Sequence, residues 1–525
     1  MNRILLTMAL AIQVLFCLSC SSRAFIGEEE YMDKLRGGWV GKIIGVQLGQ
    51  PHEFHFLSAM DESPIEWESG LIEGALGQDD IYTQLSFMQT FDRHGLDASA
   101  DQLAEAFAGA GFSLFHANLQ SRKNWRDGLR PPMTGSSLYS IHADDIDFQI
   151  DADFIGFMCP GMPQTVRKYC DRIGPIMNDG DGIYGGVFIA TMHSLAFFND
   201  DILAIVEGAL NNIPAESAYA GCIRDVVSCY KADPSDWKAA WNTVQEKWGA
   251  HICHPNHPFD IDAKINGAYV VIGLLYGNGD FWKTMEIAIR CGQDADCNSS
   301  NAAAVWGVIH GYEAIPEEFR KDLDAISGKK FDHTDYSWEE AVECTARFAR
   351  ENILSTGGSI KDGQWNIKLQ KPQFTGECRQ SFPDMQSVRS IYTTDGSWHF
   401  EGNWDSFVEW NQVDEPVVQT VEPGASAEIS FEGRMVSLVG GWDTDCGRAD
   451  VYIDDVHVRR IDSYFAYRCG FMPINRNALF LVSGLRPGPH TLKIVNTGDR
   501  NPESSGNRLM FNRLDIYDMP SLQVR

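Results

Sequence analysis

The feature that most constrains the fold of this chain is a change of sequence texture near residue 350. Over 25–350, apolar residues recur at helical spacing, as in Ile81 to Phe91. Beyond residue 396, short alternating runs such as Ala427 to Phe431 are separated by Gly, Asp and Pro. The pattern predicts an all-α domain over 25–350, a linker or an irregular wrap across the first domain over 351–395, and a β-sandwich or jelly roll over 396–520.

The first twenty residues indicate the compartment. Arg3 precedes the apolar run Ile4 to Leu18, and small residues follow it, which is typical of a secretory signal peptide over 1–20. Cys20 stands where a bacterial lipoprotein carries its lipid, and ordinary signal cleavage is the alternative. We therefore expect an exported protein, periplasmic or at the surface of a bacterium, whose membrane contact would be a lipid anchor at Cys20.

The charge and the cysteines narrow the range of partners. The formal net charge of −29 excludes nucleic acid as an expected partner, because binding a polyanion needs a basic stripe. The surface is also a poor host for an anionic substrate unless a cation intervenes. The 13 cysteines show no CxxC zinc spacing, and Cys446 and Cys469 are the pair expected to form a disulfide because both flank candidate strands.

Two pairs of carboxylates stand just before helical runs, far apart in the chain. Both Asp79/Asp80 and Asp294/Asp296 follow a Gly-Gln dipeptide, and the second helix carries the small residues Ala302 to Ala304, which would let a neighbouring helix pack closely. Crowded carboxylates repel one another, and hard divalent cations relieve that repulsion and can orient a water molecule. Helix capping is the alternative reading of either pair. The pattern shared by both pairs favours a metal site.

Three motifs follow one another along the helical half. The first runs from Leu35-Arg36-Gly37 through Gly45 to Pro51-His52-Glu53-Phe54, the second is Gln78-Asp79-Asp80-Ile81, and the third is Asp294-Ala295-Asp296-Cys297. In this order and spacing they resemble the signatures of the ADP-ribosylglycohydrolase family, over about residues 30 to 315.

The resemblance implies a fold and a metal site. It implies an all-α orthogonal bundle with two Mg²⁺ ions at its mouth. By position, Asp79, Asp80, Asp294 and Asp296 inherit the ligand roles. Glu53 aligns with the glutamate that the family keeps near the metals, and it is the candidate general acid/base or substrate-controlling group.

Two positions depart from the family pattern. Gln78 and Cys297 stand where the family has threonine ligands. The side-chain carbonyl of Gln78 can still bind Mg²⁺, but a thiol is a poor partner for a hard ion. One metal position is therefore expected to be altered, lost or occupied by another cation.

A Gly-rich segment from Asn178 to Gly186 stands where the family has its substrate loop. Because glycine permits close approach of the backbone to a ligand, we predict that Asn178, Asp179, Asp181 and Tyr184 bind substrate. The two aspartates would repel a pyrophosphate and suit sugar hydroxyls. The alternative is a Gly-rich turn that caps the following helix.

The β half resembles carbohydrate-binding jelly-roll modules at Asp443 to Asp454 and at Leu485 to Leu492. Four tryptophans are candidate platforms for stacking on sugar, with core packing as the alternative: Trp398, Trp404, Trp410 and Trp442. In the helical half, three histidines share a loop that could hold zinc or be purely structural: His251, His254 and His257.

These features together predict an exported, metal-dependent glycohydrolase that cleaves a furanoside-like O- or N-glycosidic bond in a glycan. A true ADP-ribosyl hydrolase acting on ADP-ribosylated conjugates is the first alternative, which the acidic Asp179 and Asp181 disfavour. A catalytically inactive glycan-binding surface protein is the second, which the presence of all four metal-site aspartates disfavours.

Overall fold

The computed structural model describes residues 22–253, 258–407, 416–466 and 477–519. No helix in these ranges is long and apolar enough to span a bilayer. Several predicted features lie outside the described residues: the signal segment with Cys20, His254, His257, Trp410 and Cys469, the expected disulfide partner of the buried Cys446.

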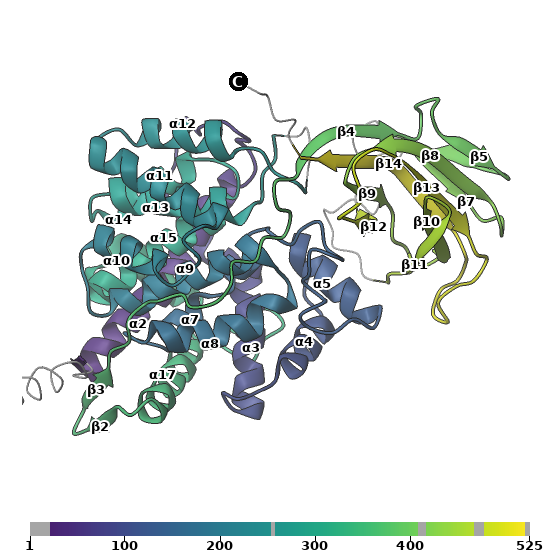
Figure 1. Ribbon diagram of the computed structural model, residues 1–525. Helices are drawn as coiled ribbons and strands as arrows, with labels where there is room; N and C mark the ends of the chain where they lie inside the picture. The colour runs from purple at the N-terminus through teal and green to yellow at the C-terminus, as the bar shows by residue number, and fades with distance from the viewer. Residues whose placement is uncertain (1–21, 254–257, 408–415, 467–476, 520–525) are drawn as a thin grey trace, which may run out of the picture.

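The N-terminal half is helical and the C-terminal half is β-rich, which confirms the predicted fold class (Figure 1). The helices are α2 (Glu28–Gly49), α3 (Asp79–His94), α4 (Ala100–Gly109), α5 (His116–Arg126), α6 (Asp147–Ile150), α7 (Asp153–Phe157), α8 (Pro163–Ile173), α9 (Gly180–Ala196), α10 (Ile202–Leu210), α11 (Ala218–Ala232), α12 (Trp237–Trp248), α13 (Ala263–Tyr276), α14 (Phe281–Arg290), α15 (Ala295–His310), α16 (Glu317–Arg320) and α17 (Trp338–Ser355).

Helices α2 and α15 lie against each other with almost no side chain between them. A methyl group at Gly41 would lie 2.3 Å from the carbonyl oxygen of Ala303, and one at Gly45 would lie 2.5 Å from that of Ser299. Glycines four residues apart form one face of a helix, so α2 presents bare backbone to α15. At the end of this contact, a methyl group at Gly49 would lie 2.4 Å from Cα of Asp296. The close packing predicted for the small residues of α15 is therefore confirmed, and it sets where Asp296 lies.

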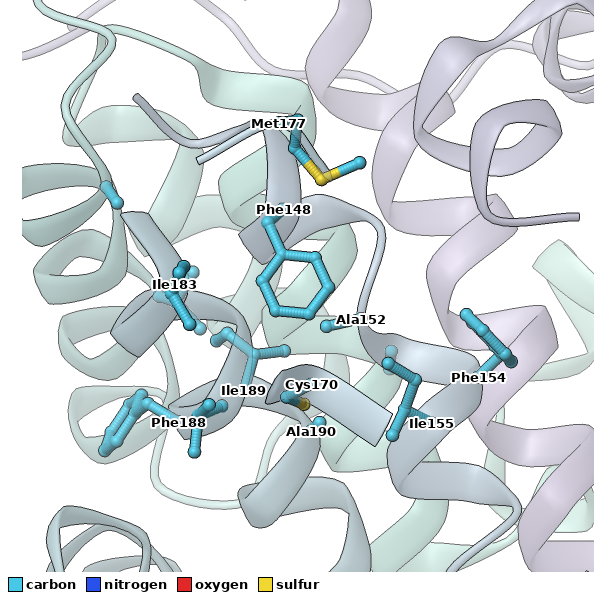
Figure 2. Packing of buried hydrophobic residues seen from close by; sticks show 14 of the residues in the cluster. Phe148, Ala152, Phe154, Ile155, Cys170, Met177, Ile183, Phe188, Ile189 and Ala190 are labelled. Carbon is cyan, nitrogen blue, oxygen red and sulfur yellow. The ribbon is translucent and has the colours of Figure 1, made fainter. Parts of the chain in front are cut away.

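The interior of the helical half is built around α9, which is buried on nearly its whole circumference. A helix that is apolar all round belongs in a core rather than at a surface. Figure 2 shows the ring of Phe148, from α6, lying among Met177, Ile183 and Ala152. A methyl group at Gly186 would lie 2.3 Å from the Phe148 ring, so glycine is required there for this packing.

The C-terminal half contains two antiparallel sheets, in the orders β11-β10-β13-β8-β5 and β12-β9-β14-β7-β6, with β4 also paired to β14. Phe400 of β5 and Phe511 of β14 meet with ring centroids 6.5 Å apart, so the two sheets face each other across a shared core. The strands are β4 (Gln386–Tyr392), β5 (His399–Glu401), β6 (Asp405–Phe407), β7 (Val417–Thr420), β8 (Ser426–Glu432), β9 (Met435–Gly440), β10 (Arg448–Ile453), β11 (Val456–Asp462), β12 (Asn477–Val482), β13 (Pro489–Asn496) and β14 (Leu509–Asp518).

The segment predicted to be an irregular linker is partly ordered into strands. Strands β2 (Ser359–Lys361) and β3 (Gln364–Lys368) form a hairpin, and β3 pairs with β1 (Arg23–Gly27) at the start of the described chain. Trp365 is fully buried beneath this small sheet. The expectation of irregular structure was wrong for 359–368, because the hairpin takes its partner strand from a distant part of the chain, which local periodicity cannot reveal. Residues 369–385 contain no helix or strand and lie across the helical domain, where the Gln370 N–H donates to the Gly161 carbonyl and the Phe374 N–H to the Asn211 carbonyl.

The β half packs against the helical half through specific contacts. The Tyr517 hydroxyl, on β14, donates a hydrogen bond to the Ile252 carbonyl at 2.9 Å. The guanidinium of Arg459, on β11, lies 4.2 Å from the centroid of the Tyr139 ring.

Two of the predicted tryptophan platforms are buried. Trp398 is 7% exposed and packs on Phe511, while Trp442 is 6% exposed and lies under the Lys123 ammonium, 5.6 Å from its ring centroid. Neither ring can stack on a sugar, so core and interface packing explains both. Trp404 is half-buried, and its indole N–H donates to the Glu401 carbonyl.

Candidate metal and catalytic site

Five carboxylates reach one place from three elements. Asp79 and Asp80 open α3, while Asp294 and Asp296 stand at the start of α15. Glu53 follows the end of α2, after a single 3-10 turn. Asp80, Asp294 and Asp296 are buried, whereas Glu53 and Asp79 are half-buried, so the group is reached from the side on which these last two lie.

The Glu53 segment is held in place by its backbone. The Phe54 N–H donates to the Gln293 carbonyl at 2.9 Å, and the Gln293 N–H donates to the Phe56 carbonyl at 2.9 Å. Phe54 and Gln293 both have positive φ, a conformation unusual for residues with side chains. This pair of hydrogen bonds places Glu53 next to Asp294.

Ordinary N-capping does not account for the whole group of carboxylates, although Oδ1 of Asp296 accepts the main-chain N–H of Cys297 at 2.8 Å. Asp294 occupies the N-cap of α15 and Gln78 that of α3, and neither side chain makes a capping hydrogen bond. Other helices of the same domain are capped in the ordinary way, for example by Asp201 and Asp280, whose side chains accept main-chain N–H groups. The Asp294 carboxylate, which stands at an N-cap position without making the capping bond, is thus available for another role.

The ligand atoms form two overlapping groups. Those of Glu53, Asp294 and Asp296 lie within 4.8 Å of one another, and so do those of Asp80, Asp296 and Cys297. Within the described residues, Oδ1 of Asp80 and Oδ1 of Asp294 are buried without a hydrogen-bond partner. A buried carboxylate oxygen without a partner is costly, and a bound cation would remove that cost.

Burial and mutual repulsion act on every carboxylate here. Burial, together with the charges of Asp296, Asp79 and Asp80, raises the pKa of Glu53 to about 9. Burial raises the pKa of both Asp79 and Asp80 to about 7, and it raises that of Asp294 well above its ordinary value. Without a cation, therefore, the cluster holds protons at neutral pH.

A buried lysine lies beneath the cluster. Lys42 of α2 is fully buried, and its Nζ lies 2.7 Å from Oδ2 of Asp153 and 3.9 Å from Oδ1 of Asp80. Oδ1 of Asp153 lies 2.6 Å from Nε2 of His193 and accepts a hydrogen bond from Asn301. Burial raises the pKa of Asp153, but Lys42 and His193 more than offset this effect and lower the pKa to about 2. Lys42 is thus the cation that faces the acidic site from inside the protein.

Comparison with known proteins identifies the family of the helical half. The sequence profile described as ADP-ribosylglycohydrolase matches residues 27–351, which is more than half of the chain. The chain belongs to the ADP-ribosylglycohydrolase family. A solved structure described as an ADP-ribosylglycohydrolase-related protein complex is similar over 62% of this chain and 99% of its own, at 15% identity and a TM-score of 0.44.

Two curated relatives come from Flavonifractor plautii. An A type blood N-acetyl-α-D-galactosamine deacetylase is 32% identical over 192 residues, which are 36% of this chain and 23% of the relative. An A type blood α-D-galactosamine galactosaminidase is 31% identical over 96 residues, which are 18% of this chain and 8% of the relative. The chain spans less than a quarter of the length of these curated relatives.

The Mg²⁺ expected of an ADP-ribosylglycohydrolase fits one part of the site better than the other. The group of Glu53, Asp294 and Asp296 offers only carboxylate oxygens, which suit a hard ion. In the other group, the Cys297 thiol donates to Oδ2 of Asp80 at 3.3 Å, so sulfur stands among the oxygens. Gln78 is half-buried at the N-cap of α3, next to Asp79. The departure from the family pattern is thus concentrated at Cys297.

The predicted substrate loop is largely committed to internal hydrogen bonds. The Asn178 amide donates to the carbonyls of Ala143 and Asp145, and Asp179 caps α9. The Tyr184 hydroxyl accepts from the Arg379 N–H at 2.7 Å. These three side chains hold the chain together. The alternative of a Gly-rich turn before the helix differs from the structure, because α9 begins at Gly180 and Asp179 is its N-cap.

Asp181 is placed differently from the rest of that loop. It lines a cavity of about 510 Å³ with Asp144, Asp262, Lys264 and residues 380–387, which run into the start of β4. Burial raises the pKa of Asp181 to about 6, although Lys264 opposes the shift. Of the four residues predicted to bind substrate, Asp181 is the one that faces open space.

Several polar residues near the site were not predicted from the sequence. Lys42 lies within the first motif, where a lysine between apolar residues of a Gly-rich helix was an available signal of burial. Asp145, Asp147, Asp151 and Asp153 recur through one short segment, and all are buried. In a sequence, such an acidic run indicates a solvent-exposed surface, and only the fold shows that it is buried.

Proposed function

We propose that this chain is an exported, metal-dependent glycohydrolase that cleaves a furanoside-like O- or N-glycosidic bond in a glycan. The observation that carries the proposal is the convergence of Glu53 with Asp79, Asp80, Asp294 and Asp296. None of the four aspartates has been lost, although two neighbouring ligand positions have changed. An inactive protein would be under no constraint to keep them together.

Each side chain has a chemical task in this proposal. Asp79, Asp80, Asp294 and Asp296 would hold divalent cations, whose chemistry is to neutralise these carboxylates and to polarise an oxygen atom of water or substrate. Glu53 is half-buried, and its raised pKa keeps a proton available for a leaving oxygen or nitrogen at neutral pH. Lys42 orients Asp80 from inside the protein.

A glycan is the favoured substrate for two reasons. Both curated relatives carry names of enzymes that act on galactosamine glycans. The predicted substrate residue Asp181 lines a cavity with three further aspartates and one lysine, a lining that suits hydroxyl groups and disfavours a pyrophosphate. The apolar run from Ile4 to Leu18 supports the proposed export. The intact mass of the mature protein and acyl labelling at Cys20 would test it.

The deciding experiment measures turnover of aryl furanosides and of ADP-ribosyl-arginine, each with Mg²⁺ and with EDTA. We expect furanoside cleavage that EDTA abolishes, and a loss of about 100-fold or more in kcat/KM for Asp79→Ala and Asp296→Ala. Asp280→Ala, which removes a helix cap of α14, is the matched control and should keep full activity.

Two outcomes would favour the alternatives. Turnover of ADP-ribosyl-arginine alone would support ADP-ribosyl hydrolysis, the reaction that gives the family its name. If the metal-loaded protein turned over none of these substrates, the alternative of a catalytically inactive glycan-binding protein would be favoured. If Asp79→Ala and Asp296→Ala kept both their metal and their activity, the assignment of the ligands would be wrong.

A further inference from the structure

A second group of metal-ligating side chains lies beside the acidic site. His116 opens α5, while His142 and Asp145 belong to the loop before α6. Both imidazoles face one carboxylate oxygen, because Oδ2 of Asp145 lies 2.6 Å from Nδ1 of His142 and 3.9 Å from Nδ1 of His116. The three ligand atoms lie within 4.8 Å of one another. The side chains are 11%, 8% and 3% exposed for His116, His142 and Asp145, so the group is nearly enclosed.

Aromatic rings separate this group from the carboxylates of the first site. The Phe259 ring stacks on His116 with centroids 5.4 Å apart, and the Phe54 ring packs on Phe259 with centroids 4.7 Å apart. Since Phe54 directly follows Glu53, the contacts His116–Phe259 and Phe259–Phe54 connect the histidine group to the segment that carries Glu53. The two groups are therefore neighbours with different ligand chemistry.

The surroundings of Asp145 carry more negative than positive charge. Burial raises the pKa of Asp145 well above its ordinary value, and the charges of Asp262 and Asp260 raise it further. A hydrogen bond from the Cys253 thiol and the charge of Lys264 oppose this shift. Lys264 is itself paired with Asp262, so it cannot balance the remaining carboxylates. A divalent cation at Asp145 would supply the missing charge.

We propose that His116, His142 and Asp145 bind a zinc ion, with a fourth position left for water or a substrate oxygen. Imidazole nitrogen and carboxylate oxygen are ordinary zinc ligands at about 2.0–2.2 Å, and two imidazoles select against Mg²⁺. The ion would replace the hydrogen bond between His142 and Asp145. It would join the start of α5 to the loop before α6, and Cys253 would orient the carboxylate ligand.

The site is independent of the proposed function, and zinc content tests it directly. The full chain, purified without a polyhistidine tag, is loaded with Zn²⁺ in excess Mg²⁺ and then gel-filtered. We expect about one zinc ion per chain, and the same zinc in an Asp79→Asn/Asp296→Asn variant. We expect His142→Ala and Asp145→Asn to bind zinc at least about tenfold more weakly. His399→Ala, at an exposed position of β5, should retain the full amount.

A measurement on the unmutated protein guards against variants that fail to fold. X-ray absorption at the zinc edge should show nitrogen and oxygen ligands at about 2.0–2.1 Å with imidazole scattering. A shell of oxygen alone, a wild-type chain without zinc, or full zinc retention by folded His142→Ala would each overturn the proposal. Loss of zinc from the Asp79→Asn/Asp296→Asn variant would also overturn it, because the ion would then belong to the acidic site.

Discussion

At the scale of single residues, the acidic site combines charges that ordinarily avoid one another. Buried carboxylates are stable when they are protonated, paired or bound to a cation. Here Lys42 pairs with Asp153 and approaches Asp80, while Glu53 and Asp294 lie beyond its reach. The thiol of Cys297 occupies a position where an oxygen ligand would serve a hard ion better. Substitutions of Lys42 and Cys297 therefore test most clearly how the site is built.

Restoring an oxygen at position 297 should strengthen the binding of a hard ion. We expect Cys297→Thr to bind Mg²⁺ about tenfold more tightly by isothermal titration calorimetry, because a hydroxyl replaces sulfur beside Asp80. Cys378→Thr, in the chain that leads to β4, is the matched control and should leave the Kd unchanged. An identical Mg²⁺ affinity in Cys297→Thr would mean that residue 297 is not next to the ion.

Removing the buried Lys42 should lower the stability of the protein, because it leaves buried carboxylates without their cation. We expect Lys42→Met to lower the free energy of unfolding by about 3–5 kcal/mol, because Asp153 and Asp80 then lose their cation. In the Lys42→Met/Asp153→Asn double variant, the loss should be smaller than the sum of the two single losses. Urea unfolding of all four proteins measures this coupling, and strictly additive losses would contradict the ion pair.

At the scale of elements, the contact of α2 with α15 determines where the carboxylates meet. Gly41, Gly45 and Gly49 bring the two helix backbones together, and the last of them touches Asp296. A change in this contact would move the start of α15 relative to Glu53, which follows α2 after a single 3-10 turn. Packing of the helices and geometry of the site are thus coupled.

A single methyl group in the contact of α2 with α15 should disturb both the helix packing and the geometry of the metal site. Gly41→Ala would place its Cβ 2.3 Å from the carbonyl oxygen of Ala303, so we expect a loss of about 1–3 kcal/mol or more in unfolding free energy, together with weaker metal binding. Gly109→Ala, where no atom lies within 4 Å of the new Cβ, is the control and should be neutral or slightly stabilising. Equal stability of the two variants would argue against the close approach.

At the scale of the whole molecule, the acidic site links folding to pH and to cations. The folded chain raises the pKa of Asp79 and Asp80 from 3.8 to about 7, and burial raises that of Asp296 to about 6. For an acid, a raised folded-state pKa favours the protonated native protein. The stability that these groups contribute is therefore complete below about pH 3.8 and is lost as the pH rises to about 7.

Metal-free protein should accordingly melt at a lower temperature as these groups ionise. Between pH 4 and pH 7 in EDTA, we expect the Tm of the wild type to fall by several degrees relative to that of Asp79→Asn/Asp296→Asn. Added Mg²⁺ should restore the wild-type Tm and leave that of the variant unchanged. The comparison with the variant isolates Asp79 and Asp296 from Asp80 and the other buried titrating residues. A difference in Tm that stays constant with pH would show that the aspartates do not titrate in this window.

The sequence by itself determined the division into a helical and a β-rich half, because helical and strand periodicity are local properties. It also marked the paired aspartates, since they lie in short motifs that open helices. Only the tertiary structure decided that Trp398 and Trp442 are buried, that 359–368 pairs with the first strand, and that His116 meets Asp145. Each of these depends on contacts between segments far apart in the chain or on burial, and neither leaves a periodic trace in the sequence.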